Sequence, residues 1–317
     1  MYYPFMRGRQ NELLCLMELL NNDMLTNITP VIEPVKYSKQ FYDILCTFSK
    51  SEKRFVLVRN PSVGQFEKER INYLNSQQNS SLLRNIDANE YDTLRNGSNV
   101  ISGYLCSMDF VKTLDVNHSG LNDAFVLNTS EDASEIYERS PVLQEASVTF
   151  LPHDEDFREI VNTKQVLFRD HFKKRKRNVD YQDIEDEFFS KDHLIFQKHG
   201  YIGFSDYSIV GAEYEESGFA PAAIAIHIVY FDKNNSLYVH HFVSDSNGSQ
   251  KDPARKFQEA MEKLIQWNKN SNTTMTLGLK KLIDCYEEKR FPGLGIIKRY
   301  SMMHHLELMN NYLETKS

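Results

Sequence analysis

Eight short apolar runs, separated by stretches of helical periodicity, most restrict how this 317-residue chain can fold. The runs are rich in Val, Ile, Leu and Phe and are apolar throughout, which is typical of parallel strands buried on both faces. They are YYPFMRG near the amino terminus, ITPVIEPVK (28–36), RFVLVRNP (54–61), NVISGYLCSMD (99–109), DAFVLNTS (123–130), SVTFLPHDED (147–156), KQVLFRD (164–170) and GYIGFSD (200–206). Eight such strands alternating with helices predict an α/β fold, a (β/α)8 TIM-barrel-like architecture, with a doubly wound open sheet as the alternative.

The last third of the chain departs from a plain barrel. Residues 221–247 read as a β-hairpin, because two β-rich runs flank the turn-forming DKNNS. DPARKFQEAMEKLIQWNKN has an aspartate N-cap, a proline in the first turn and an apolar helical stripe, and FPGLG precedes a last helix. Without an internal repeat or a linker, we expect a single domain over 1–317. Its barrel core would be 1–210, with a hairpin and helical extension at 211–317 packed on it.

Composition limits the protein class. A hydrophobic fraction of 41% supports a packed core, and a net charge of −7 makes direct nucleic-acid binding by the whole chain unexpected. The four cysteines lie far apart, which matches neither a zinc site nor a disulfide framework. The amino terminus lacks an apolar signal core, and no segment has the length of a membrane span. We therefore expect a cytoplasmic protein with no membrane contact.

Ligands of such barrels bind at the carboxyl ends of the strands, and this rule selects candidate residues. The candidate ligand-binding residues at or just beyond these ends are Arg7, Glu33, Lys36, Arg59, Asn128, His153, Arg169, Asp170, Ser205, Asp206 and Tyr207, and Asn60, Ser107 and Asp109 stand at the same ends. Mutual ion pairs could explain so ionic a ring. Alternatively, its arginines suit a phosphate or carboxylate ligand, and its carboxylates and histidine suit acid–base work or a divalent metal. No residue is assigned as catalytic or as a metal ligand.

Two of these carboxylates have specific alternatives. Glu33, between Ile32 and Pro34, should be partly buried, either as an ion-pair partner of Arg7 or Arg59 or as a metal ligand or general base. Asp206 either caps a following turn or completes a pocket with Asp170, Glu33 and Arg59.

Charged and histidine-bearing segments give weaker signals. The connection between the seventh and eighth runs holds the basic KKRKR (173–177), which could meet phosphates but is followed by the acidic DYQDIEDE, so a solvated face is favoured. His240 and His241 point to opposite faces of a strand, so at most one joins a site, and we select His241. His304 and Glu307 share a helix face as a metal pair would, but a packed or capped histidine fits better.

Nucleotide and nucleophile motifs are missing from the sequence. It has no GxGxxG, GxxxxGK[ST], GxSxG or CxxC, which disfavours P-loop chemistry and nucleophile-elbow hydrolysis.

Several segments resemble a known family. YYPFMRGRQNELLCLMEL and ITPVIEPVK resemble the start of the bacteriophage beta-protein-like family ("Beta family protein"). RNVDY, EFFSKDH, GYIGFSDYSIVG, AIAIHIVYF, HHFVSDSN and FPGLGIIKRYSMMHHLEL resemble a bacterial branch of it, so the resemblance covers nearly the whole chain. The resemblance implies a small nuclease-like partner protein encoded nearby and a role in defence against phage or mobile elements. It implies no catalytic residues.

Three functions remain open at this stage. The first is a barrel scaffold that binds a ligand or a partner effector at the carboxyl strand ends. The second is a metal-assisted hydrolase or phosphodiesterase acting on a phosphorylated small molecule or nucleotide. The third is a direct nucleic-acid binder using residues 173–177. Convergence of Glu33, Arg59, His153, Asp170 and Asp206 on a cavity would favour the enzyme, whereas their pairing with other groups would favour the scaffold.

Overall fold

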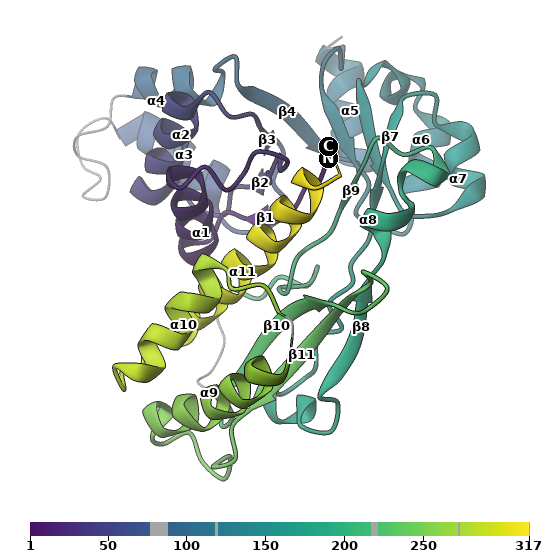
Figure 1. Cartoon of the computed structure of the whole chain (residues 1–317). Helices are drawn as coiled ribbons and strands as arrows, with labels where there is room; N and C mark the ends of the chain where they lie inside the picture. Colours follow the sequence, from purple (N-terminus) through teal and green to yellow (C-terminus); the bar gives the residue numbers. More distant parts are fainter. Residues whose placement is uncertain (77–87, 118–119, 217–220, 272, 317) are drawn as a thin grey trace. The chain divides into compact units, whose positions relative to one another are not determined.

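The computed structural model describes residues 1–76, 88–117, 120–216, 221–271 and 273–316, and the chain forms two compact units (Figure 1). The first unit comprises Met1–Leu13, Asn27–Arg169 and Ile195–Asp206, and the second comprises Leu14–Thr26, Asp170–Leu194 and Tyr207–Ser317. Two helices, α1 (Gln10–Asn21) and α8 (Asp192–Ile195), run from one unit into the other along the chain.

An eight-stranded parallel sheet forms the core of the first unit. Its strands are, in spatial order, β1 (Phe5–Arg7), β2 (Val31–Glu33), β3 (Phe55–Val58), β4 (Val100–Leu105), β5 (Phe125–Leu127), β6 (Val148–Leu151), β7 (Lys164–Phe168) and β9 (Gly203–Ser205). Each of the eight predicted runs contains one of them. A parallel bridge between Tyr2 and Phe204, and a hydrogen bond of 2.8 Å from Phe5 N to Asp206 O, bring β9 back to β1. The sheet is therefore a nearly closed barrel, and the predicted (β/α)8 fold is confirmed.

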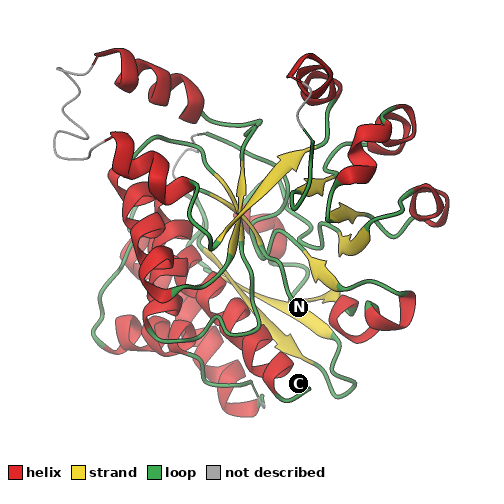
Figure 2. Cartoon of the chain, turned by 90° about the horizontal axis from the view of Figure 1, so that it is seen from above, coloured by secondary structure: helices red, strands yellow, loops and turns green. Residues whose placement is uncertain are grey.

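Helices follow the barrel strands and lie outside them (Figure 2). They are α2 (Lys39–Ser51), α3 (Phe66–Ser76), α4 (Ala88–Arg95), α5 (Met108–Asn117), α6 (Ala133–Arg139), α7 (Glu155–Ile160) and the 3-10 turns η1 (Pro141–Glu145) and η3 (Gln197–His199). Helix α2 illustrates why they form. The Ser38 side chain accepts from Phe41 N at the first turn, and the stripe Phe41, Ile44, Leu45 and Phe48 is buried.

The second unit contains the predicted hairpin, β10 (Ala225–Phe231) and β11 (Leu237–Val243), paired antiparallel. Asp232 Oδ1 accepts from the backbone of Asn234 and Ser236, and Asn235 adopts φ +59°, which an asparagine tolerates in a tight turn. Besides the parts of α1 and α8 that belong to it, this unit contains α9 (Pro253–Asn270), α10 (Leu277–Glu287) and α11 (Leu294–Glu314). Helix α9 begins as predicted, with Asp252 accepting from Arg255 N and Pro253 in the first turn.

The charged connection between β7 and β9 contains a strand that the sequence did not predict. β8 (Asp186–Ser190, DEFFS) pairs antiparallel with β11, and the 3-10 turn η2 (Asn178–Tyr181) precedes it. Residues 14–26 and 170–194, which we assigned to the barrel core, cluster with the carboxyl-terminal unit. The expectation of a single domain stays a prediction.

None of the helices in the described ranges combines the length and apolar character that crossing a membrane requires.

Candidate functional site

Arg7 and Glu33 are brought together at the ends of adjacent strands. β1 and β2 pair in a register that sets these two residues side by side, and Arg7 Nη1 forms an ion pair with Glu33 Oε2. Glu33 Oε1 accepts from Ser62 N at 2.7 Å and from Ser62 Oγ at 3.0 Å. Glu33 is fully buried, so a paired and hydrogen-bonded charge is the arrangement that burial requires.

Arg59 and Asn128 donate hydrogen bonds to residues of neighbouring strands and loops. Arg59 Nε donates to Ser102 Oγ at 3.1 Å, and its Nη2 donates to the carbonyl of Arg95 at 2.8 Å. Burial lowers the pKa of Arg59, with a smaller contribution from Arg95. Asn128 Nδ2 donates to the carbonyl of Phe150 at 2.7 Å, whereas its buried Oδ1 has no hydrogen-bond partner among the described residues.

His153 and Lys36 lie at the surface. His153 Nδ1 is 3.1 Å from the Tyr201 hydroxyl, and its ring packs at 4.8 Å from that of His199. Desolvation, and then the nearby charge of His199, lower the pKa of His153. Lys36 is exposed after β2. Neither residue is brought to Glu33.

Asp206 and Ser205 bind the amino-terminal segment. The Tyr2 hydroxyl donates to Asp206 Oδ1 at 2.7 Å, and Ser205 Oγ donates to the carbonyl of Tyr3 at 2.6 Å. Burial and Asp206 raise the pKa of Tyr2 well above its usual value, so Tyr2 stays a donor. Arg169 N donates to the carbonyl of Ser205 at 3.2 Å. Neither sequence-based alternative for Asp206 included the bond to Tyr2.

The remaining candidates belong to the second unit. Asp170 is exposed, and its carboxylate accepts from Phe172 N at 3.1 Å and Ala212 N at 2.7 Å. Tyr207 is buried. The Nδ1 atoms of His241 and His227 are 2.7 Å apart, and burial lowers the pKa of His241 to about 4, so this pair is neutral at neutral pH and shares one proton between the facing nitrogens.

A cavity of about 620 Å³ lies at the carboxyl ends of β3, β4 and β5. We call it the barrel-mouth cavity, and its lining includes Ser62, Glu67, Cys106, Ser107, Ser130 and Asp132. None of the candidates selected above lines it, although Asn60, Ser107 and Asp109 from the same strand ends do. Sequence reasoning considered the last residues of each strand, whereas most lining residues stand in the following loops, where Ser62, Ser130 and Asp132 offered a signal.

Local bonds position the walls of the barrel-mouth cavity. Asn60 donates to the carbonyl of Leu105 at 2.9 Å and accepts from Leu105 N at 2.8 Å, which ties β3 to the end of β4. Ser107 Oγ accepts from Phe110 N at 3.2 Å and so caps α5. Burial, together with Asp132, raises the pKa of Cys106 to about 12. The thiol is therefore protonated at neutral pH and is a poor nucleophile.

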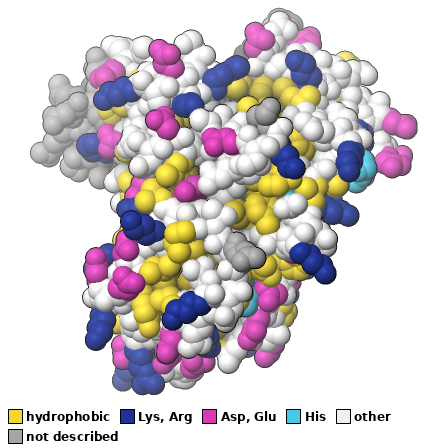
Figure 3. All heavy atoms as spheres, in the orientation of Figure 1, with side chains coloured by type: hydrophobic (Ala, Val, Ile, Leu, Met, Phe, Trp, Pro, Cys, Tyr) yellow, Lys and Arg dark blue, Asp and Glu magenta, His cyan; other side chains and the backbone are white. Residues whose placement is uncertain are grey.

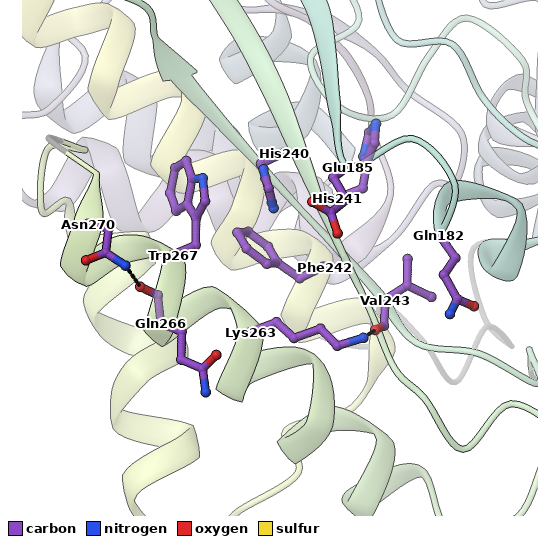
Figure 4. A pocket seen from close by; sticks show the side chains of 10 residues that line it. All are labelled: Gln182, Glu185, His240, His241, Phe242, Val243, Lys263, Gln266, Trp267 and Asn270. Atoms are coloured by element: carbon purple, nitrogen blue, oxygen red, sulfur yellow. Dashed lines mark hydrogen bonds between the residues drawn. The ribbon is translucent and has the colours of Figure 1, made fainter.

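A second pocket, of about 400 Å³, lies between β11 and α9 in the second unit (Figure 4). The rings of His240, Phe242 and Trp267 gather there, with centroids 4.3 to 5.5 Å apart. His240 Nδ1 is 2.8 Å from Asp186 Oδ1, and no described residue bonds to its Nε2. This arrangement can offer a ligand one ring nitrogen. His241, the histidine selected from the sequence, also lines this pocket, so the expectation that at most one of the two joins a site is wrong here. The partner of His240, Asp186, stands on the unpredicted strand.

The histidines of the last helix have structural roles. His304 Nδ1 is 2.8 Å from Thr276 Oγ1 and its Nε2 is 2.7 Å from the carbonyl of Val229, while Glu307 accepts from Leu277 N at 2.7 Å. The packed and capped interpretation is confirmed. In the described ranges, no group of three or more His, Cys, Asp or Glu side chains could hold a metal ion, so the divalent metal that the sequence left open has no such group there.

A serine, a histidine and an aspartate also meet in the second unit. His171 Nε2 lies 2.7 Å from Asp192 Oδ2 and 3.2 Å from Ser190 Oγ. Because both oxygens contact the same nitrogen, the ring cannot relay a proton from the serine to the aspartate, as a catalytic triad requires. The cluster therefore ties the chain segments together.

The basic run is largely neutralised by nearby acids. Arg177 pairs with Asp180 at 2.6 Å, and Lys173 and Arg175 both pair with Glu187, at 3.3 and 2.6 Å. On the face shown in Figure 3, acidic and basic side chains are interspersed. The preference for a solvated face agrees with these pairs.

Comparison of the chain with protein-family models, curated proteins and solved structures finds no significant match.

Proposed function

We propose that the protein is the binding component of a bacterial defence module, a barrel scaffold that holds a segment of a partner protein in the barrel-mouth cavity. The observation that carries this proposal is the make-up of the cavity. It combines hydroxyl groups, apolar side chains and the carboxylates of Glu67, Asp109 and Asp132, with no lysine or arginine among its described lining residues. Such a lining favours a basic partner segment over a phosphorylated molecule.

Asp132 is the carboxylate most open to a partner. Glu67 pairs with Arg70 at 3.0 Å and Asp109 with Lys112 at 3.4 Å, whereas no ion pair of Asp132 is seen in the described part of the chain. Asp132 also stands at the N-cap position of α6 without a side-chain cap bond, so its replacement should leave the helix intact.

The resemblance to the beta-protein-like family supplies the partner in this proposal. It implies the small nuclease-like protein encoded nearby, and the two would meet in the cytoplasm during defence against phage or mobile elements. The alternative, a metal-assisted hydrolase or phosphodiesterase, has less support. Glu33, Arg59 and Asp206 are each bonded to separate groups, and the described residues offer no metal donor set.

The test is calorimetric titration of the purified protein with the purified neighbouring protein. Asp132→Lys, which reverses the charge, and Ser130→Trp, which fills the cavity, should each weaken binding about tenfold or more. Glu159→Lys is the matched control, because Glu159 is exposed on α7 and does not line the cavity. Equal binding by Asp132→Lys, Ser130→Trp and wild type would place the contact elsewhere, and no binding by wild type would contradict the proposed partner.

A further inference from the structure

A smaller pocket, of about 220 Å³, lies in the second unit between η2, β10 and α11. We call it the β10–α11 pocket, and its lining includes Phe172, Arg175, His227, Ile297, Lys298 and Ser301. It is separate from the barrel-mouth cavity and shares no lining residue with it.

Two buried polar atoms of this lining have no hydrogen-bond partner in the described part of the chain. Ser301 is 1% exposed, and its Oγ is unsatisfied. Arg175 uses Nη2 for Glu187 Oε1, while its buried Nε is unsatisfied. Folded proteins satisfy nearly all buried polar groups, and each exception costs stability. Both residues line one cavity, which makes it the place where an acceptor from outside the chain could reach them.

The charges around the pocket favour an anion. Lys174, Arg175 and Lys298 line it, and no aspartate or glutamate is among its described lining residues. Burial, His241 and Lys298 together lower the pKa of His227, so the positive potential of Lys298 reaches the pocket wall. Two of these cations are already ion-paired, Arg175 with Glu187 at 2.6 Å and Lys174 with Glu215 at 2.9 Å and Glu213 at 3.4 Å, so an anion would add to these pairs.

The rest of the lining is apolar. Phe172, Ile209 and Ile297 are each less than a tenth exposed. The volume equals about seven water molecules at liquid density, which limits the ligand to a compact body. We propose that the β10–α11 pocket binds a small organic anion, with its carboxylate or phosphate group at Arg175, Lys298 and Ser301 and an apolar or aromatic body against Phe172 and Ile297. The site is independent of the partner-binding function proposed above.

The test uses benzoate and phenyl phosphate as probes. Benzamide is the control ligand without a charge, and inorganic phosphate is the control ligand without an apolar body. At least one of the two anions should raise the melting temperature of the full-length protein in proportion to the logarithm of its concentration, and benzamide should not. The anion that binds more tightly shows whether the site prefers a carboxylate or a phosphate group. In titrations, Lys298→Gln should weaken its binding about tenfold or more, and Ser301→Leu should abolish it by filling the pocket.

Controls separate binding from folding. Lys233→Gln removes the same charge from the exposed hairpin turn and should bind as wild type does. Histidine NMR adds a second measurement, since a bound anion should raise the pKa of His227 by offsetting Lys298. The proposal is overturned if neither anion shifts the melting temperature, if Lys298→Gln binds as wild type does, or if inorganic phosphate binds as tightly as the aromatic anions.

Discussion

Replacing Glu33 by glutamine tests whether the most deeply buried carboxylate at the barrel mouth is structural. The substitution preserves shape and an acceptor for Ser62, but removes the charge that pairs with Arg7. Breaking a buried ion pair by removing one partner costs about 3–5 kcal/mol. The Arg7 side chain is 12% exposed and can gain some solvation, so we expect the lower end, about 3 kcal/mol. Arg7→Met should cost more, because it leaves the fully buried Glu33 charge unpaired.

The assay must distinguish the two compact units. Trp267, the single tryptophan, belongs to the second unit, so its fluorescence reports that unit, whereas far-UV circular dichroism reports both. In urea unfolding, the Glu33→Gln substitution should therefore lower the midpoint of the first unit, which circular dichroism detects. The double variant Arg7→Met/Glu33→Gln should recover much of the loss, which a double-mutant cycle measures. A loss below about 1 kcal/mol, or a gain, would refute the structural interpretation and support a charge retained for function.

Two further predictions concern the second unit. Gly278→Ala should destabilise this unit by about 2 kcal/mol or more, because a Cβ would lie 2.2 Å from the Tyr300 carbonyl and 2.6 Å from His304 N. The cost of this clash exceeds the roughly 1 kcal/mol that alanine gains in helix propensity. An unchanged urea midpoint, measured by Trp267 fluorescence, would contradict the prediction. Burial lowers the pKa of His304 to about 4 and that of His305 to about 3. Below about pH 6.5, only the unfolded state therefore binds these two protons. The free energy of unfolding should decrease as the pH falls from about 6.5 towards the pKa values of the folded state. At pH 5.5 the two histidines together should cost about 3 kcal/mol relative to pH 7.5, and equal urea midpoints at the two pH values would show that they are not held neutral.

The barrel could be predicted because each strand carries its own signal. A strand such as Phe55–Val58 is buried along its whole length, so its four apolar residues reflect its position directly. β8 gives no such signal. Its DEFFS sequence begins with two acids that bond to His240, which is 54 residues away, and to Arg175 in the preceding loop. A strand stabilised by charges on other elements reads as a charged loop when its partners are unknown.

Pairing at the strand ends was only partly accessible from sequence. Arg7 was among the expected partners of Glu33, because parallel strands place their carboxyl ends side by side. The bond between Tyr2 and Asp206 joins residues 204 positions apart and depends on how the barrel closes. The residues of the barrel-mouth cavity were not predicted, because the conformation of the loops decides which side chains face the cavity. The pattern of apolar residues in the sequence does not reveal loop conformation.

A ligand-binding site is indicated where residues with unsatisfied polar atoms lie together, and the total number of such atoms is less informative. Asn128 Oδ1 is unsatisfied at the end of β5, but no cavity among the pockets described above includes it. Ser301 and Arg175, whose Oγ and Nε atoms are unsatisfied, both line the β10–α11 pocket, together with Lys298. A single acceptor-rich group can satisfy several donors at once only where they face one space, and its binding then recovers each of their separate desolvation costs. Ligand screens should therefore monitor the second unit as closely as the barrel mouth, where most of the charges already have partners.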